Sequence, residues 1–252
     1  MNSVPDRTQR TAVVTGGGGG IGAAICARLV QAGYVVYVAD LAVSAAEAVA
    51  ARVGGVALEL DVVSTSSVTG AVSRMLEEAG SIDVLVNAVG WDEHRPIVES
   101  DDKFIAHVLE INLAGPIRMT REVLPSMMRA GYGRIVNIAS DAGRVGSSLE
   151  GVYSAAKAGI IAFTKTTARE AARAGITANC VCPGPTDTAL LSGIIAKSPD
   201  AEKVISAITR STPLKRLGMP DDVAVGVLMF AGDDAGFITG QTLSVSGGLT
   251  MV

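Results

Sequence analysis

Runs of apolar residues alternate along this chain with alanine-rich stretches of helical spacing. Within each run the apolar residues are nearly continuous, which is typical of strands buried on both faces. Helical candidates separate the first six runs, so the pattern predicts a doubly wound α/β fold, with helices on both faces of a parallel sheet of about seven strands. The predicted strands are residues 11–15, 34–40, 56–62, 82–90, 134–140, 176–182 and 241–248.

No repeat, low-complexity segment or linker divides the sequence, and 252 residues lie within the range of one α/β domain. We therefore expect a single domain over residues 1–252. Its least regular stretch is 183–215, where "PGPTDT", "KSPD" and "STPLKRLGMP" surround a short helical segment. So long a connection inside a compact domain is more often functional than accidental, and we interpret it as a substrate lid.

The composition restricts the class of function. Hydrophobic residues make up 48% of the chain, and the net charge is −4 with no long basic run. These values do not fit a protein that binds nucleic acid or an anionic membrane surface, and they favour a small-molecule substrate. The first ten residues are polar, and the longer uncharged runs are interrupted by Gly, Ser and Thr. We therefore expect a cytoplasmic protein without a membrane span.

Cysteine and histidine usage indicates neither a disulfide nor a metal site. Cys26, Cys180 and Cys182 form neither an even disulfide set nor a C-x-x-C pair, so we expect buried free thiols. His94 and His107 have no partner at a metal-ligand spacing, and we expect no metal.

A glycine run, "TGGGGGIG" at residues 15–22, follows the first predicted strand and opens the first helix. Glycines at such a turn let the backbone approach a pyrophosphate, whose charge is met by the helix N-terminus, as in Rossmann folds. The run fits two registers, G-x-G-x-x-G from Gly17 and T-G-x-x-x-G-x-G from Thr15. The residues expected to contact a dinucleotide here are Gly16, Gly19, Gly20, Ile21 and Gly22.

Asp40 ends the second predicted strand, about twenty residues beyond the glycine run. A carboxylate at this place accepts hydrogen bonds from an adenosine ribose. It would repel a 2′-phosphate, and neither the glycine run nor "DLAV" supplies an Arg or Lys to pair with one. The sequence therefore predicts NAD rather than NADP as the cofactor.

Tyr153 and Lys157 lie one helical turn apart in "GVYSAAKAG". Hydride transfer between an alcohol and a ketone needs a group that exchanges a proton with the substrate oxygen, and a free phenol, with a pKa of about 10, is a poor base near neutrality. The Lys157 ammonium would lower that pKa and could also reach the nicotinamide ribose. Ser140 ends the fifth predicted strand, where doubly wound folds bind ligands, and can hydrogen-bond the substrate oxygen. We expect all three to be catalytic.

Asn112 adds a feature of backbone chemistry in "EINLAGPIRMT". Pro116 has no N–H, so the carbonyl of Asn112 loses its normal helical partner four residues on. That oxygen is therefore free to bind another donor.

Six short motifs together resemble the short-chain dehydrogenase/reductase family, at that family's spacings. They are "TGGGGGIG", "VNAVG" (86–90), Asn112 in "EINLAG", Ser140 in "NIAS", "YSAAK" (153–157) and "PGPTDT" (183–188). The resemblance extends from the first predicted strand to "GFITGQTLSVSGG". Two positions depart from the family pattern: Val86 stands in the usual Asn-Asn-Ala-Gly motif, and Ser246 replaces an acidic residue.

The resemblance implies further roles. Asn112 would hold a water that links Lys157 to solvent in a proton relay, and the family is usually tetrameric, which implies a homotetramer. Tyr153 and Lys157 would also contact the nicotinamide ribose. The remaining implied cofactor contacts are Asp61 and Val62 at the adenine, Asn87, Ala88 and Gly90 at the adenosine ribose, and Pro183, Gly184, Thr186 and Thr188 at the nicotinamide.

The segments "GWDE", "SDAGRVGSSLEGVY" and "VCPGPTDT" are similar to the 2-hydroxycyclohexanecarboxyl-CoA dehydrogenases, which oxidise the β-hydroxyl of an alicyclic acyl-CoA. This similarity implies a substrate site formed by Ser140, Tyr153, Trp91 and Arg144. Trp91 would form an apolar wall for a ring, or it could equally be a packing residue of the loop. Arg144 would pair with a phosphate or carboxylate of the substrate, or it could be an ordinary solvated arginine.

Two other functions remain open. A 3-oxoacyl-(acyl-carrier-protein) reductase would use the same catalytic residues, but such reductases more often use NADPH, which Asp40 disfavours. A nucleotide-binding protein without turnover would share the fold. The joint presence of Asn112, Ser140, Tyr153 and Lys157 argues against it, because such a protein needs none of them.

Overall fold

The computed structural model describes residues 9–196 and 200–252. Within them, seven parallel strands form one sheet in the order β3-β2-β1-β4-β5-β6-β7. The strand order reverses between β1 and β4, which is where doubly wound folds bind ligands. The predicted fold class is thus confirmed. The strands are β1 (Thr11–Thr15), β2 (Val35–Asp40), β3 (Val56–Glu59), β4 (Val84–Asn87), β5 (Gly133–Ile138), β6 (Ile176–Pro183) and β7 (Thr242–Val245).

Several strands are shorter than the apolar runs that predicted them. β3 ends at Glu59, so Asp61 and Val62 lie in the turn before the next helix and not at the strand end. β4 ends at Asn87, which leaves residues 88–90 in a loop. In both places the chain remains apolar after the last ladder hydrogen bond, because it still packs under neighbouring helices.

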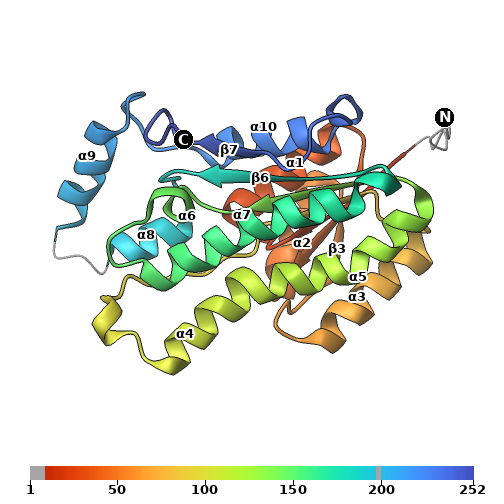
Figure 1. Ribbon diagram of the computed structural model, residues 1–252, viewed down its shortest axis with the longest axis horizontal. Helices are drawn as coiled ribbons and strands as arrows, with labels where there is room; N and C mark the ends of the chain where they lie inside the picture. The colour runs from red at the N-terminus through yellow and green to blue at the C-terminus, as the bar shows by residue number, and fades with distance from the viewer. Residues whose placement is uncertain (1–8, 197–199) are drawn as a thin grey trace.

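Helices cover both faces of the sheet (Figure 1). One face packs against α1 (Gly20–Gln31), α2 (Val43–Val53) and α10 (Pro220–Ala231). The other packs against α3 (Thr65–Ala79), α5 (Gly115–Ala130) and α7 (Gly151–Ala171). The shorter elements are α4 (Asp102–Leu109), α6 (Ala142–Val145), α8 (Ala189–Ile195), α9 (Ala201–Ser211), η1 (Ile97–Glu99), η2 (Glu110–Ala114), η3 (Ala172–Ala174) and η4 (Asp233–Ala235).

Successive residues of the central strands enter different cores. Ala12 and Val14 of β1 point into the core beneath α1, α2 and α10, whereas Val13 between them points into the core beneath α3 and α5. All three are fully buried. This double burial explains why the strand sequences are apolar without alternation.

The region predicted as a lid contains two helices, α8 and α9, separated by the undescribed residues 197–199. They lie at the end of the molecule opposite the N-terminus, together with α6, where β6 ends (Figure 1). No residue of α9 is buried, although the helix contains Val204, Ile205 and Ile208. Its role as a substrate lid stays a prediction. Among the helices of the described residues, none has both the length and the apolar character needed to cross a membrane.

Candidate active site

Lys157 and Tyr153 project from α7 beneath the carboxyl end of β5. Lys157 is only 2% exposed, and its Nζ donates a hydrogen bond to the Ile138 carbonyl at 3.0 Å. The same Nζ lies 5.5 Å from the centre of the Tyr153 ring. Gly143 makes this packing possible, because a Cβ at that position would lie 2.7 Å from the carbonyl carbon of Lys157. The predicted placement of the two side chains on one helix face is therefore present.

Burial has opposite effects on the pKa values of these two groups. Desolvation lowers the pKa of Lys157 to about 8, and the nearby side chains of Cys180, Cys182 and Asp92 act against that change. Desolvation raises the pKa of Tyr153, and the nearby carboxylates of Glu150 and Asp92 raise it further. A hydrogen bond with the Ser140 side chain lowers it in part. The protein surroundings thus favour a neutral phenol, so burial outweighs the lowering that we expected from Lys157.

Ser140 is the second residue after β5, which ends at Ile138 and not at residue 140 as predicted, and it lies beside the phenol. Its Oγ accepts a hydrogen bond from the Ala142 backbone N–H at 3.1 Å, which fixes the rotamer at the start of α6. The hydroxyl also hydrogen-bonds Tyr153. Two groups able to bind one substrate oxygen therefore stand together at this edge of the sheet.

Asn112 lies in η2, a π-helical turn between α4 and α5, and its side chain is fully buried. Its amide hydrogen-bonds the Trp91 backbone twice: Nδ2 donates to the carbonyl at 2.7 Å, and Oδ1 accepts from the N–H at 3.2 Å. Pro116 has no N–H to offer the Asn112 carbonyl. A Cβ on Gly90 would lie 3.4 Å from Asn112 Oδ1 and 3.5 Å from Lys157 Nζ, so these three residues border the same small space.

The glycine run forms the turn from β1 into α1, and its conformation decides between the two registers. Gly16 and Gly20 have positive φ angles of 67° and 50°. A Cβ on Gly22 would lie 2.1 Å from the Gly16 carbonyl oxygen, whereas one on Gly19 would meet nothing within 4 Å. The required glycines are therefore those of T-G-x-x-x-G-x-G from Thr15. Ile21 is partly buried and packs against the core beneath α1.

Asp40 faces this turn from the end of β2. Its Oδ2 accepts from the Gly18 backbone N–H at 3.0 Å and its Oδ1 from that of Ala42 at 2.9 Å. A Cβ on Gly18 would lie 2.9 Å from Asp40 Oδ2. No Lys or Arg of the described chain forms an ion pair with Asp40. The edge of the crevice is thus acidic beside the glycine turn.

Asn87 has a different environment from the one expected for a ribose contact. It is 2% exposed, and its Nδ2 donates to Asn137 Oδ1 at 2.8 Å, in a chain that continues from Asn137 to Thr164. Only its backbone could therefore meet a ribose. Ala88 follows in the loop, where its N–H donates to the Thr15 hydroxyl at 3.1 Å. This hydrogen bond holds the loop after β4 against the glycine turn.

The segment after β6 lies next to the same turn. A Cβ on Gly20 would lie 3.4 Å from Thr188 Cγ2. Thr188 is the N-cap of α8, and its hydroxyl accepts from the Leu191 N–H at 3.3 Å. Gly184 packs against Ser246, since a Cβ there would lie 2.7 Å from the serine Cβ. The other two predicted contacts, Pro183 and Thr186, are buried.

At the other end of the predicted cofactor site, Asp61 and Val62 follow β3. Asp61 Oδ1 accepts from the Val63 N–H at 2.9 Å, which forms the turn into α3. Val62 is 5% exposed and packs on Gly115, with only 2.8 Å between its Cγ2 and a Cβ built there. Its carbonyl accepts from Arg118 at 3.3 Å. Val62 therefore has a packing role whether or not it meets a ligand.

Trp91 and Arg144, the predicted substrate residues, have different partners within the protein. The Trp91 ring packs edge-on against Phe104 and His107, in a cluster that includes Tyr153. Arg144 instead extends toward β7, where Nη1 donates to Ser244 Oγ at 2.9 Å and to the Thr242 carbonyl at 3.3 Å. The guanidinium thus has partners within the protein, which sequence spacing could not reveal.

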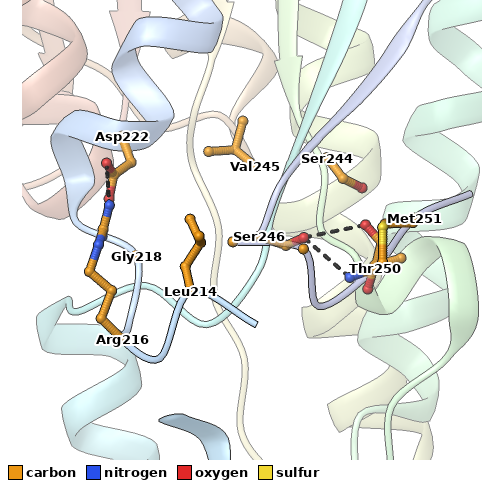
Figure 2. Close-up of a pocket in the computed structure, with 11 residues that line it drawn as sticks. Leu214, Arg216, Gly218, Asp222, Ser244, Val245, Ser246, Thr250 and Met251 are labelled. Atoms are coloured by element: carbon orange, nitrogen blue, oxygen red, sulfur yellow. Dashed lines mark hydrogen bonds and ion pairs between the residues drawn. The ribbon is translucent and has the colours of Figure 1, made fainter. Parts of the chain in front are cut away.

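A separate hollow of about 330 Å³ opens beside the end of β7. Figure 2 shows the Arg216–Asp222 ion pair on one side of it and Ser246, hydrogen-bonded to Thr250, on the other. None of the four predicted catalytic side chains lines this hollow.

Two acidic residues near Tyr153 were not predicted from the sequence as site residues. Asp92 follows Trp91 and is buried, and Glu150 is the N-cap residue of α7. One ligand atom each from Asp92, Glu150 and His94 lies within 4.8 Å of the others. The sequence separates Asp92 from Glu150 by 58 positions, so nothing in its local pattern predicts their approach.

The residues around this edge of the sheet fit a bound dinucleotide. A turn without side chains opens a twelve-residue helix, an acid faces that turn, and Tyr153, Lys157 and Ser140 stand at the carboxyl ends of the strands. Fold and site together define a nicotinamide-dependent oxidoreductase.

Comparisons with known proteins agree. The sequence model of a family described as enoyl-(acyl carrier protein) reductase matches residues 16–250. An acetoacetyl-CoA reductase of Shinella zoogloeoides is 40% identical over 240 residues, which cover 95% of this chain and 98% of that protein. A 3-oxoacyl-(acyl-carrier-protein) reductase of Escherichia coli is 35% identical over 245 residues, covering 96% and 98%. The structure of a levodione reductase matches with a TM-score of 0.92 at 28% identity, covering 95% and 96%.

The chain belongs to the short-chain dehydrogenase/reductase family. It is accordingly an oxidoreductase that interconverts a secondary alcohol and a ketone with a nicotinamide cofactor, NAD or NADP.

Proposed function

We propose that this protein is an NAD-dependent dehydrogenase that oxidises a secondary alcohol to a ketone, with the β-hydroxyl of an alicyclic acyl-CoA, or a similar cyclic alcohol, as substrate. The observation that supports this proposal most is the approach of Ser140, Tyr153 and Lys157 at one edge of the sheet, beside a glycine turn that faces Asp40. More than a hundred residues of sequence separate the glycine turn from these three side chains, and the sheet places both at the carboxyl ends of its strands.

In the proposed mechanism Ser140 and Tyr153 hydrogen-bond the hydroxyl of the substrate, and Tyr153 takes its proton. When bound, the oxidised nicotinamide supplies the hydride acceptor and a positive charge close to the phenol. Lys157, fixed by the Ile138 carbonyl, orients the ribose and adds its own positive charge. The Asn112 carbonyl holds a water through which the proton leaves toward solvent. The Trp91 ring excludes water from the apolar side of the site.

The preference for NAD is supported by the surroundings of Asp40. Two backbone N–H groups hold its carboxylate in place, and the described residues supply no cation beside it. A 2′-phosphate would therefore meet an uncompensated negative charge. The proposed cofactor contacts are Gly16, Gly19, Gly20, Ile21, Gly22, Asp40, Asp61, Val62, Asn87, Ala88, Gly90, Tyr153, Lys157, Pro183, Gly184, Thr186 and Thr188.

A second candidate function is a 3-oxoacyl-(acyl-carrier-protein) reductase. It is favoured by the relatives, since two of them act by name as reductases of acetoacetyl-CoA and of a 3-oxoacyl carrier protein. It shares the reaction class and the catalytic groups, and it differs in cofactor and in the carrier of the acyl chain. Arg144 belongs to the proposed substrate site only if a ligand phosphate or carboxylate displaces one of its contacts with β7.

A spectrophotometric screen tests these functions. We expect NADH to form from NAD with alicyclic β-hydroxyacyl-CoAs and cyclic secondary alcohols, and more slowly with simple secondary alcohols. Efficient NADPH oxidation with 3-oxoacyl carrier protein, without NAD reduction by any alcohol, would instead favour the second candidate. If neither cofactor reacts with any substrate, both fail.

Three further expectations complete the proposal. Residues 183–215 act as a lid, the protein assembles as a homotetramer, and it works in the cytoplasm. The exposed residues of α9 support the first, because an amphipathic helix without buried contacts can close over a bound substrate.

A further inference from the structure

Two acids meet beside the proposed catalytic tyrosine. Asp92 lies in the loop after β4 and is 6% exposed, and neither of its carboxylate oxygens has a hydrogen-bond partner in the described chain. Glu150 comes from the other side, at the N-terminus of α7, three residues before Tyr153. Its nearest side-chain contact of opposite charge type is with the exposed His94, at 3.7 Å from Nε2 to Oε1. Two carboxyl groups thus face each other at the wall of the site, and the exposed His94 lies beside them.

A buried carboxylate beside a second, partly buried one is costly unless one of the two is protonated. The pKa of Asp92 is raised to about 7, mainly by desolvation and in addition by the neighbouring Glu150 carboxyl. The Glu93 backbone and the more distant Lys157 ammonium act in the opposite direction. Near neutral pH Asp92 therefore keeps its proton in part of the molecules, and the Glu150 carboxyl lies next to it.

The charge of these acids acts on the catalytic groups. Tyr153 is faced by Glu150 and Asp92, by Ser140 after β5, by Cys182 of β6 and by Lys157 on its own helix. Of these, both acids raise the phenol pKa. Asp92 also helps to keep Lys157 charged. The protonation of the acids and that of the tyrosine are therefore coupled.

We propose that Asp92 and Glu150 form a carboxyl pair that shares one proton and sets the pH above which Tyr153 accepts the proton of the substrate. Both are positioning residues, since they act through Tyr153. This inference rests on the proposed function, because it assigns the pair to the reaction of the same site. When the shared proton is lost at higher pH, a negative charge is added beside the phenol. This charge makes the ionisation of Tyr153 harder.

The first test is the pH dependence of kcat/KM for alcohol oxidation. In Glu150→Gln only one negative charge remains when Tyr153 ionises, so the acidic limb should move to lower pH by about half a unit or more. Asp92→Asn should move it in the same direction, and the double variant, which leaves neither charge, should shift it by at least the sum of the two. Glu99→Gln, an exposed acid on η1, is the control and should leave the profile unchanged.

The second test needs no turnover. In the folded protein the pKa of the buried Asp92 lies above its unfolded value of about 3.9. The protonated carboxyl is therefore compatible with the fold at low pH, and the stability that this protonation contributes is lost as the pH rises toward 7. The melting temperature of Asp92→Asn should therefore exceed that of wild type at pH 8, and the difference should shrink toward pH 4. Glu150→Gln should behave alike if one proton is shared, and Glu99→Gln should not.

The outcomes separate the inference from the function. If wild type oxidises alcohols but the variant profiles coincide with its own, the pair is not coupled to Tyr153 and the inference fails alone. If wild type oxidises none, the proposed function fails and melting still tests the shared proton. A third outcome would also overturn the inference of a shared proton. If added Mn²⁺ or Mg²⁺ stabilises wild type at pH 8 but does not stabilise Asp92→Asn, a cation and not a proton lies between the two acids.

Discussion

Burial dominates the chemistry of the central residues. The sequence shows a phenol and an ammonium one turn apart, from which a lowered phenol pKa follows. The structure adds that Lys157 is buried, that Tyr153 is partly buried and that two acids stand nearby, so the pKa of Tyr153 rises instead. The helical spacing was predictable because it depends on five consecutive residues. The acids were not, because Asp92 and Glu150 approach only through the packing of the β4 loop on α7.

Asp40 sets the cofactor preference in this account. Asp40→Ala should reduce the ratio of kcat/KM for NAD over NADP by about tenfold, since about 1.4 kcal/mol of ribose binding and phosphate repulsion disappears. The ratio is measured with one alcohol and both cofactors. Glu47→Ala, an exposed acid on α2, is the matched control and should leave the ratio as it is. An unchanged ratio in Asp40→Ala would remove the ribose role.

Gly22 and Gly19 belong to one run, but they differ sharply in the space available for a side chain. Gly22→Ala places a Cβ 2.1 Å from the Gly16 carbonyl and should destabilise the fold by about 1–3 kcal/mol through overpacking. Gly19→Ala meets no atom within 4 Å and should unfold like wild type. Urea unfolding of both variants measures the difference. Equal stabilities would contradict the register assigned to the turn.

Among the elements, the sheet and its long helices follow from the sequence, because continuous apolar runs and helical spacing are local patterns. Element ends do not follow in the same way: β3 stops at Glu59 while the chain stays apolar through Val62, which packs on Gly115 of α5. The interruption at η2 was predictable in part from Pro116. Its π-helical form, and the clamp of Asn112 on the Trp91 backbone, depend on tertiary contacts.

The two prolines of α5 allow a matched test of that interruption. Pro116→Ala offers the Asn112 carbonyl a backbone N–H and should lower kcat by about tenfold, a loss of roughly 1.4 kcal/mol, by competing with the relay water. Pro125→Ala, at an exposed position in the same helix, should leave kcat unchanged and raise stability. If both variants retain full kcat, the free carbonyl has no part in the reaction.

At the scale of the whole molecule, the exposed apolar side chains argue for assembly. Val225 and Met229 lie one turn apart on α10 and are 53% and 49% exposed, and Phe237 and Met251 are exposed nearby in sequence. Light scattering after size exclusion should give a mass about four times 25.6 kDa. Val225→Lys combined with Met229→Lys should reduce that mass. A wild-type monomer at micromolar concentration would contradict the predicted homotetramer.

The central claim is that Tyr153 exchanges the proton of the substrate beside a bound nicotinamide dinucleotide. Tyr153→Phe keeps the ring and its contacts with Trp91 and Phe104 but removes the hydroxyl. Its kcat for alcohol oxidation should fall by about 10²–10⁴-fold or more, while NADH still binds with wild-type affinity as measured by fluorescence titration. Turnover within a few-fold of wild type, with NADH binding intact, would contradict the account.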